Sequence, residues 1–563
     1  MNVPSYHEVL SSVKVKIMQK LPSEIQLLII DYLGALDILH LQLTCKYYHR
    51  VIEKSARNIW RNCLRQQCIE NELFWPSFKD LSLASEFKDA CTTSSRVVKF
   101  YETALERRDA VLRRTQITQL DFSEGLEDDD IQDIQEIFLV PGGRFLLTLQ
   151  QFKWLCVWDL TLTRDDSQTY NLRLQPLLRH GIDAYENLVF IDAVIDSTKI
   201  RLLVKIRSGI PQEVASSINL GESSDQDVLG YQYLQLSMSG DTWSVQQLSH
   251  LTVIYPNGVS SLVKYNTLGD DKVIFHANSV TFVWDFVQNH VSMWCLEGVP
   301  QVYDVFSFGT HMFYLGLEGI FGLERPPFEP IECNCIIVPP ASTSNTLTIS
   351  PAFSILHQRR HENVDRVSGP DSCNSRILNY APIIYEITET EQQNDDNSTI
   401  DVDIPQPRVT TIHRYRFRFN PTRPTESKLD LIESSTAHRR PLMLNPQPYS
   451  LSNGRLAAVW TEDYEDIQNE HWQTTSLFLS LSSKFDPTTH CDPHSVVDPT
   501  IELPIRTELG LVKFCDVEPS DDEDDETPPL NALACEFCPQ TGRAIVLWES
   551  EYMSWVTLYD FLC

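Results

Sequence analysis

Three widely separated segments of this 563-residue chain share one pattern: an apolar run, a tight turn containing Gly-Arg, and a second apolar run. The segments are FLVPGGRFLLTL (138–149), YSLSNGRLAAVW (449–460) and FCPQTGRAIVLW (537–548). Gly143, Gly454 and Gly542 would supply the positive φ angle that a tight hairpin turn needs. The pattern therefore predicts repeated antiparallel hairpins over the larger part of the chain.

A second unit recurs where strands are expected to end. It is an apolar run closed by an aromatic residue and Asp, and it occurs as LCVWDL (155–160), TFVWDF (281–286) and VTLYDF (556–561). The separation of Asp159 and Asp285 is three intervals of roughly 42 residues, a length typical of WD repeats. These units resemble the WD-type blade of a β-propeller. The repeats are degenerate, because the Gly-His element of that family is absent and most intervals have no Trp-Asp.

This resemblance implies an all-β propeller over residues 116–563 with long loop insertions. Seven blades fit the length best, six or eight stay open, and another all-β architecture such as stacked sandwiches is the alternative fold. Five stretches rich in Pro, Ser, Asn and charged residues are expected to be loops between strands. They are residues 209–227, 357–375, 389–408, 484–500 and 516–529.

The front of the chain follows a helical pattern instead. Pro22 suits a helix start, Gly34 a helix stop, and Asp37 the N-cap of a second helix. One apolar face is formed at helical spacing by Ile25, Leu28, Ile29, Tyr32 and Leu33. The apolar pattern resumes at Tyr48 and continues through Leu64, so a small bundle of short helices is expected.

The order of these residues resembles the F-box. The matching positions are Leu21-Pro22-Ser23-Glu24-Ile25, Ile29, Leu33, Asp37-Ile38-Leu39, Leu43, Cys45-Lys46, Tyr48, Ile52 and Trp60. Thr44 stands where the family often has Val, and Tyr48 stands where Trp is common. Both departures keep size or aromaticity. The chain is therefore divided into a tail (1–20), an F-box (21–65), a helical linker (66–115) and the propeller (116–563).

In the F-box family this helical unit binds a Skp-type adaptor, which links it to a cullin–RING ubiquitin ligase. The resemblance implies a substrate receptor, with the F-box docking on the adaptor and the propeller binding a target protein that the sequence does not identify. The implied adaptor-binding residues, shared between the internal core and the docking groove, are Leu21, Pro22, Ile25, Ile29, Leu33, Leu39 and Leu43. The alternative is a propeller scaffold whose helical front is only a structural cap.

Charge is unevenly divided along the chain. Residues 1–115 hold 17 Lys+Arg and 13 Asp+Glu, a net charge of +4, whereas the whole chain carries −31, so residues 116–563 carry −35. An acidic body argues against a general nucleic-acid binder. In HRYRFRF (413–419), a strand would put Arg414, Arg416 and Arg418 on one face and three aromatic residues on the other. These arginines are a candidate pocket for an acidic or phosphorylated partner, and a surface strand paired to acidic loops is the alternative.

No catalytic signature accompanies these features. The sequence has no Gly-rich phosphate loop before a helix, no GxSxG and no HExxH. Cys535 and Cys538 with Cys491 and His494 could form a zinc site, but their place in a hairpin favours plain core cysteines. We therefore expect a non-catalytic protein without metal or cofactor. The scattered cysteines, the lack of a secretory signal and the lack of a membrane-spanning apolar run favour the cytoplasm or nucleus and no membrane partner.

Overall fold

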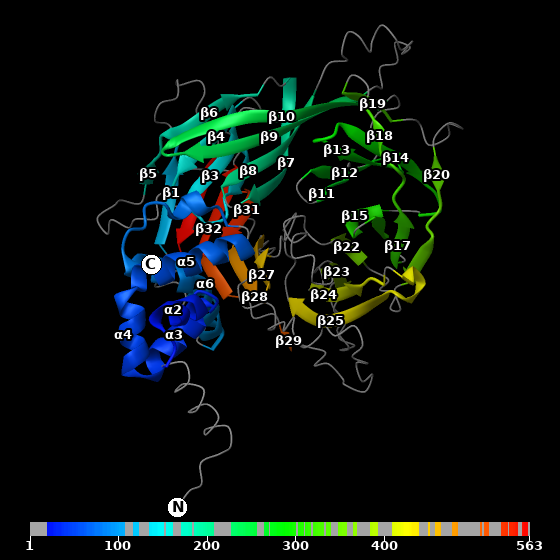
Figure 1. Cartoon of the computed structure of the whole chain (residues 1–563). Coiled ribbons are helices and arrows are strands. Elements are labelled where there is room, and N and C mark those ends of the chain that lie inside the picture. Colours follow the sequence, from blue (N-terminus) through cyan, green and yellow to red (C-terminus); the bar gives the residue numbers. More distant parts are fainter. Residues whose placement is uncertain are drawn as a thin grey trace, which may run out of the picture.

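The computed structural model shows a helical region followed by a sheet-rich region (Figure 1). The residues that it describes are 20–71, 73–106, 116–122, 134–150, 154–160, 171–182, 185–196, 198–207, 227–255, 264–268, 271–277, 279–299, 302–308, 310–316, 319–331, 334–338, 347–356, 364–368, 383–391, 408–420, 422–437, 449–450, 456–462, 476–481, 507–508, 512–516, 531–538, 540–549 and 554–560. Within these ranges, no helix is long and apolar enough to cross a membrane.

The helical region begins with four α-helices in close succession. They are α2 (Ser23–Ile30), α3 (Ala35–Thr44), α4 (Lys46–Lys54) and α5 (Ala56–Glu70), followed by a 3-10 turn (Trp75–Phe78) and the long α6 (Ala84–Glu106). Gly34, not Asp37, occupies the N-cap of α3, so the predicted cap was wrong. Asp37 lies instead in the first turn, where a carboxylate favours the positive end of the helix dipole. At the start of α6, hydrogen bonds from the backbone N–H groups of Leu83 and Ser82 lower the pKa of Glu86.

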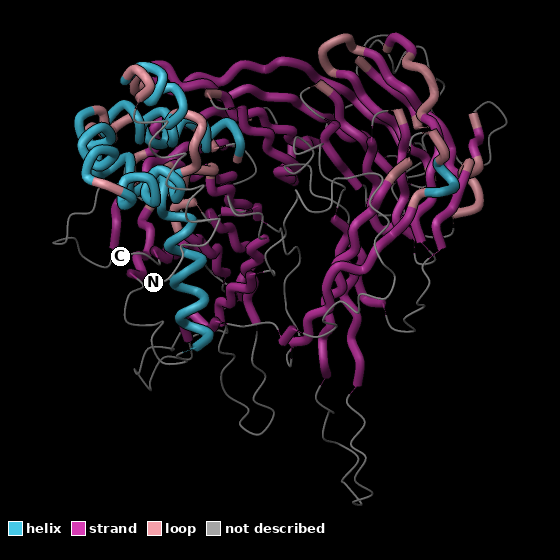
Figure 2. The backbone as a smooth tube through the Cα atoms, turned by 60° about the horizontal axis from the view of Figure 1, so that its bottom comes forward, coloured by secondary structure: helices cyan, strands magenta, loops and turns pink. Residues whose placement is uncertain are grey.

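One hydrophobic core joins all five α-helices. Ile38, Ile52 and Trp60 are buried in it together with Phe78 of the 3-10 turn and Cys91 of α6. The segment expected to be a linker therefore packs on the helices that precede it, and α5 and α6 lie against each other. Figure 2 shows these helices gathered at one side of the strands.

The described strands form seven sheets. The first contains β2 (Ile134–Leu139), β3 (Phe145–Gln150), β4 (Trp154–Asp159) and β6 (Pro176–Gly181). The second contains β7 (Tyr185–Asp196), β8 (Lys199–Arg207), β9 (Asp227–Ser239), β10 (Thr242–Tyr255) and β19 (Cys335–Ile337). The third contains β11 (Lys264–Leu268), β12 (Lys272–Ala277), β13 (Val280–Asp285), β14 (His290–Leu296), β18 (Glu329–Pro330) and β20 (Thr348–Ile349). The fourth contains β15 (Val302–Phe308), β16 (His311–Gly316), β17 (Gly319–Glu324) and β21 (Phe353–Leu356).

Three further sheets complete the set. The fifth contains β22 (Val364–Ser368), β23 (Ile383–Glu391), β24 (Arg408–Arg418), β25 (Lys428–Ala437) and β29 (Thr507–Glu508). The sixth contains β26 (Tyr449–Ser450), β27 (Leu456–Glu462), β28 (Ser476–Leu481) and β30 (Val512–Asp516). The seventh contains β31 (Asn531–Cys538), β32 (Arg543–Glu549), β33 (Ser554–Asp560), β1 (Gln116–Asp121) and β5 (Asn171–Arg173).

Each sheet is built mainly from consecutive antiparallel strands, and the sheets lie around a common centre, as in a β-propeller (Figure 1). The seventh sheet differs, because β1 from the start of this region pairs antiparallel with β33. Residues 116–120 and 556–560 are thereby joined by one ladder. The all-β propeller expected from the sequence is confirmed, and the blade count of the whole chain stays a prediction.

The repeated units seen in the sequence occupy equivalent places. Each Gly-Arg segment spans the first two strands of its sheet, namely β2 and β3, β26 and β27, or β31 and β32. Each unit that closes on Asp forms the third strand, namely β4, β13 or β33. Gly143 and Gly542 both have φ of +66°, as predicted, while Gly454 lies outside the described residues.

The Arg of the turn and the Asp that closes the third strand form one link. In the first sheet, Arg144 donates to both carboxylate oxygens of Asp159, from Nε at 2.9 Å and from Nη2 at 2.7 Å. In the seventh sheet, Nε of Arg543 donates to Asp560 at 3.2 Å. Antiparallel pairing explains the repeat, because the start of the second strand lies beside the end of the third. The two sequence units are therefore halves of one structural unit.

The predicted 42-residue spacing was wrong. Asp159 closes the third strand of the first sheet and Asp285 that of the third sheet, so two intervals, not three, separate them. The second sheet lies between them, and its β9 and β10 have 13 and 14 residues, twice the length of β3 or β13. Two expected loops were also partly strand, because Val364–Ser368 within 357–375 forms β22 and residues 389–391 within 389–408 belong to β23.

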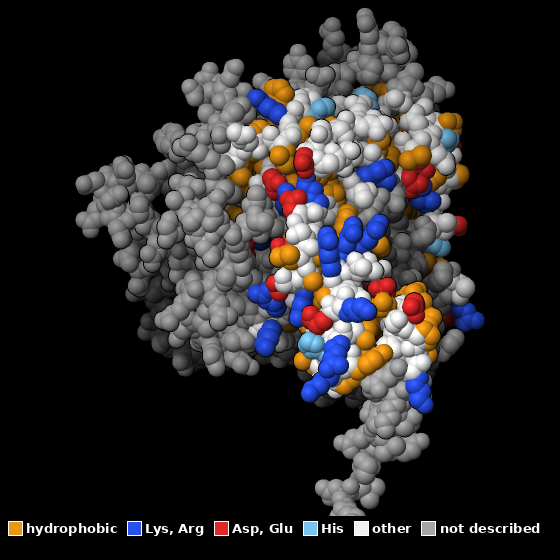
Figure 3. Space-filling view, turned by 60° about the vertical axis from the view of Figure 1, so that its left-hand side comes forward, with side chains coloured by type: hydrophobic (Ala, Val, Ile, Leu, Met, Phe, Trp, Pro, Cys, Tyr) orange, Lys and Arg blue, Asp and Glu red, His pale blue; other side chains and the backbone are white. Residues whose placement is uncertain are grey.

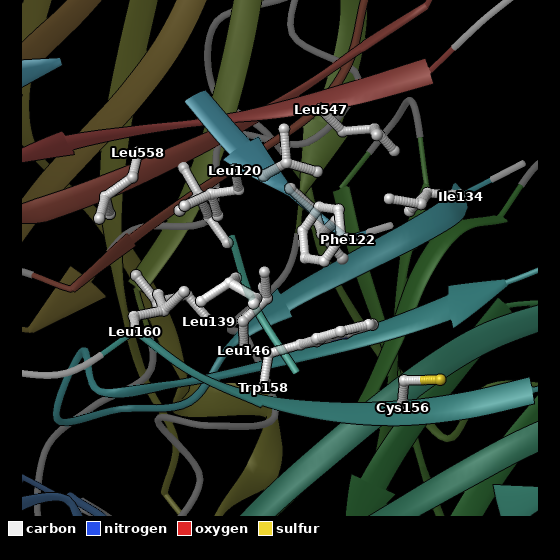
Figure 4. Packing of buried hydrophobic residues seen from close by; sticks show 14 of the residues in the cluster. Leu120, Phe122, Ile134, Leu139, Leu146, Cys156, Trp158, Leu160, Leu547 and Leu558 are labelled. Atoms are coloured by element: carbon white, nitrogen blue, oxygen red, sulfur yellow. The ribbon is translucent and has the colours of Figure 1, made fainter. Parts of the chain in front are cut away.

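Hydrophobic cores lie between successive sheets. Figure 4 shows one of them, in which Trp158 of β4 packs with Leu146 of β3, Leu120 of β1 and Leu547 of β32. The indole N–H of Trp158 is satisfied by the hydroxyl of Thr148 at 2.9 Å. This core joins the first and seventh sheets, so the start and the end of the propeller region share it.

A buried polar chain connects the third and fourth sheets. Trp294 donates to the hydroxyl of Tyr314 at 2.8 Å, and that hydroxyl donates to Thr281 at 3.0 Å. His276 lies 2.9 Å from the same threonine oxygen. Burial lowers the pKa of His276 to about 4, since the charged imidazolium is disfavoured away from water.

Candidate protein-docking site

The turn between α5 and α6 contacts the propeller. Phe74 is fully buried in the core between the first and second sheets, stacked on Trp243 of β10 with ring centroids 5.5 Å apart. Asp80 forms an ion pair with Arg144, the residue that also binds Asp159. The helices are therefore held to the propeller by the buried Phe74 side chain and by Arg144, which pairs with both Asp80 and Asp159.

Gly142 shows how closely the two regions approach. Its φ is +114°, and a Cβ atom added there would lie 2.6 Å from the Ser77 hydroxyl of the 3-10 turn. On the other side, its backbone N–H donates to the Sγ of Cys538 in β31 at 3.3 Å. Helical region, first sheet and seventh sheet thus meet at one hairpin turn.

At the opposite end of the helical region, α2 has an unusual distribution of residues. Its buried positions are Gln26 and Ile30. The side-chain amide of Gln26 donates to the carbonyl of Leu21 at 2.8 Å and to the hydroxyl of Tyr47 at 2.9 Å, so the buried polar group is satisfied. A glutamine faces the core, and apolar residues on the other faces of the helix are left exposed.

We call these exposed residues of the first helices the apolar surface. Its members, with large apolar side chains on α2, on α3, at the start of α4 and in the turn after α2, are Ile25, Leu28, Tyr32, Leu36, Leu43 and Tyr47. Tyr32 is 85% exposed, Leu43 80% and Leu28 53%. The spacing of Ile25, Leu28 and Tyr32 places them on one face of the helix and its following turn. Apolar side chains concentrated on one small helical unit are typical of an interaction surface.

The structure places the seven predicted adaptor-binding residues in or beside this surface. Pro22, Ile25 and Leu43 are exposed, whereas the remaining four, Leu21, Ile29, Leu33 and Leu39, are half-buried. Leu33 and Leu39 also pack against the helical core. None of the seven is fully buried, and their binding role stays a prediction.

Four members of the apolar surface were not among the predicted site residues. Leu28 and Tyr32 belonged to the apolar face recognised in the sequence. That face has more apolar residues than one small core can bury, and this surplus could have indicated that they are exposed. Leu36 and Tyr47 gave no such signal, because their exposure depends on how α3 and α4 pack.

The second candidate site lies on β24. Phe417 is buried and packs on Phe313 of β16 with ring centroids 4.9 Å apart, so the aromatic face of the strand points toward the fourth sheet. The register places Arg414 opposite Glu433, Arg416 opposite Asp430, and Arg418 opposite Lys428 on β25. The side chains of these arginines lie outside the described residues, and their role stays a prediction.

Of the nine cysteines whose side chains the structure describes, six are buried, while Cys45, Cys335 and Cys535 are half-buried. Cys538 is buried at the end of β31, as a core cysteine should be, and Cys491 and His494 lie outside the described residues. Burial raises the pKa of the Cys68 thiol to about 12, which suppresses the reactive thiolate. No group of three or more His, Cys, Asp or Glu residues in the described ranges could hold a metal ion.

Comparison with known proteins identifies the helical region. Residues 18–66 match the F-box-like family model, so the resemblance seen in the sequence is confirmed. The chain thus has an F-box-like domain ahead of a β-propeller. No curated protein matches the chain.

Solved structures resemble the chain only distantly. Of 156 matching chains, one is the β-propeller domain of Cps50 (Swd1) from Myceliophteria thermophila and another is described as the eukaryotic initiation factor. Both have a TM-score of 0.30 and 8% identity, and both matches cover 78% of this chain, with 99% and 92% of the respective structures.

Proposed function

We propose that this protein is the substrate-receptor subunit of a Skp–cullin–F-box type ubiquitin ligase. The observation that carries the proposal is the apolar surface, which lies on the helices matched by the F-box-like family. Burying such a surface against a partner stabilises both the domain and the complex. The partner is a Skp-type adaptor, and through it a cullin–RING ligase.

In this proposal the protein positions a substrate and catalyses nothing itself. The propeller would bind a target protein, and Phe74 with the Asp80–Arg144 ion pair would keep the propeller in a fixed orientation to the adaptor. A fixed orientation favours transfer of ubiquitin to a limited region of the target. Such a ligase acts in the cytoplasm or nucleus and requires neither nucleic acid nor a membrane.

The target-binding part of the proposal remains the arginine face of β24. Arg414, Arg416 and Arg418 alternate along the strand while the buried Phe417 fixes the opposite face. Guanidinium groups match carboxylate and phosphate groups in bidentate geometry, which favours an acidic or phosphorylated target. Charge reversal of the three arginines should abolish target capture and leave adaptor binding unchanged.

A second function is favoured by one observation. Because Phe74 completes the core between two sheets, the helical region also serves as a cap on the propeller. A propeller scaffold with no ligase role would need this cap, but it would gain nothing from the apolar surface on α2 and α3. The two functions therefore differ in what binds that surface.

The experiment is adaptor capture by surface variants that should not disturb the fold. Leu28→Glu with Leu43→Glu changes two exposed residues of the apolar surface, and Val287→Glu with Leu347→Glu changes two exposed residues of the propeller. Purified Skp-type adaptor should bind the wild type and the propeller variant with equal affinity, and the surface variant at least about tenfold more weakly. Equal binding by all three proteins, or no binding by the wild type, would contradict the ligase proposal. The scaffold function would then be the remaining candidate.

The double substitution Leu21→Ala with Pro22→Ala is a complementary variant. It removes side chains at the start of α2, and it should weaken adaptor capture by a few kcal/mol if these residues reach the interface. Circular dichroism distinguishes lost binding from lost helix, since Leu21 is half-buried.

A further inference from the structure

Three arginines form a row along α5. Arg57, Arg61 and Arg65 recur at every fourth position, which places them along one side of the helix, and all three are exposed. Like charges at this spacing destabilise a helix. We call this row the arginine stripe. Its mutual repulsion therefore does not help to stabilise α5.

The arginine stripe has no internal ion partner among the described residues. Carboxylates on the neighbouring helices instead accept hydrogen bonds from amides. Gln42 donates to Glu53 at 2.6 Å, and Asn62 donates to Asp31 at 3.3 Å. The guanidinium groups are therefore available to an external anion.

The surroundings of the stripe are also basic. Figure 3 shows Lys and Arg side chains gathered on one face of the helical region, in a chain whose net charge is −31. Arg50 and Lys54 of α4 are likewise exposed. The exposed basic residues of α4 and α5 thus form a locally positive face on a protein with a large negative net charge. Opposite charges at an interface set orientation and association rate.

The length of the stripe favours a polypeptide over a nucleic acid. Arg57 and Arg65 are eight residues apart, which is about 12 Å along a helix axis and matches roughly four residues of an extended chain. A nucleic-acid strand would also be repelled by the net charge of −35 on residues 116–563. A short segment of Asp and Glu fits the stripe without that repulsion.

The stripe runs beside the apolar surface. Asn62 of α5 lies between Arg61 and Arg65 in sequence and donates to Asp31, the residue before the exposed Tyr32. A protein that covers the apolar surface therefore reaches α5 without bridging a gap. We propose that the partner covering the apolar surface carries an acidic segment that binds along the arginine stripe. This inference rests on the proposed adaptor-binding function. It adds that the part of the partner beside the apolar surface is acidic.

The test measures association of the Skp-type adaptor with three forms of the full chain, at low and high salt. One variant reverses the stripe (Arg57→Glu, Arg61→Glu, Arg65→Glu). The control makes the same charge change at three exposed basic residues elsewhere, Arg96→Glu, Arg423→Glu and Lys428→Glu. At low salt the stripe variant should associate about tenfold more slowly than the control, and the difference should shrink at high salt.

A neutral variant separates charge from folding. Substituting Gln at the three stripe positions keeps helix-forming side chains, and it should give an intermediate association rate with unchanged circular dichroism. If the wild type binds the adaptor but the stripe variant and the control associate at the same rate with the same salt dependence, this inference is refuted while the proposed function stands. If the wild type does not bind the adaptor at all, both fail. Loss of single-stranded oligonucleotide binding in the stripe variant alone, with adaptor binding intact, would assign the stripe to nucleic acid and overturn the inference.

Discussion

Phe74→Ala should lower the stability of the protein, because this residue of the helical region is buried in a core of the propeller. The Phe74 side chain is 0% exposed and lies in the core between the first and second sheets, with its ring centroid 5.5 Å from that of Trp243 and 6.0 Å from that of Phe145. Truncating a fully buried phenylalanine typically lowers the free energy of unfolding by about 3–5 kcal/mol, through lost burial and the cavity left behind. We expect a loss in this range.

The assay is denaturant unfolding followed by tryptophan fluorescence, because Trp243 reports on the altered contact. Leu83→Ala, a neighbouring exposed site, is the matched control and should change stability by less than about 0.5 kcal/mol. Adaptor binding should be unchanged, since Phe74 lies away from the apolar surface. A loss below about 1 kcal/mol, or equal losses in both variants, would show that the helical region does not complete the propeller core.

Three further predictions concern single residues. Arg144→Met removes the bidentate partner of Asp159 and should lower the thermal midpoint, with a loss of about 2–3 kcal/mol in chemical denaturation. Gly142→Ala forces a Cβ atom against Ser77 at positive φ and should cost about 1–3 kcal/mol, whereas Gly142→Ala with Ser77→Gly should recover part of it. His276 takes up its proton near pH 6.5 when unfolded and near pH 4 when folded, so it should remove about 2 kcal/mol of stability between pH 7 and pH 5. The His276→Gln variant should show a correspondingly flatter pH dependence, and an unchanged slope would contradict the assignment.

The sequence predicts the hairpins and third strands of the propeller better than the number of residues between successive sheets. Hairpins and third strands are local, and Gly143, Gly542, Trp158 and Asp159 occupy the predicted roles. The number of residues per sheet depends on strand length and insertions, which sequence repeats cannot fix when most copies lack Trp-Asp. The strand Val364–Ser368 was missed because its surroundings are polar and charged.

The helices that carry the apolar surface were predicted, but its exposed face was not. The F-box resemblance locates the helices that the family model matches. The sequence SEIQLLII of α2 is apolar on nearly every side, so periodicity cannot decide which face is buried. The decision depends on Gln26, whose amide finds partners in Leu21 and Tyr47 only when the helices are assembled. Tertiary hydrogen bonding therefore determines the exposed face.

The pairing of β1 with β33 also has a consequence for how the protein is made. Gln116 and its neighbours leave the ribosome more than 400 residues before Asp560, their partner in the ladder, has been synthesised. Contacts this far apart in sequence form late and slowly, and domains emerge from the amino terminus first. The F-box-like helices can therefore fold on the nascent chain, while β1 stays without its partner strand until translation is nearly complete. A chain truncated before β31 would keep the helices and lose the strands that complete the seventh sheet. Under the proposed function, such a product would compete for the adaptor without presenting a finished propeller.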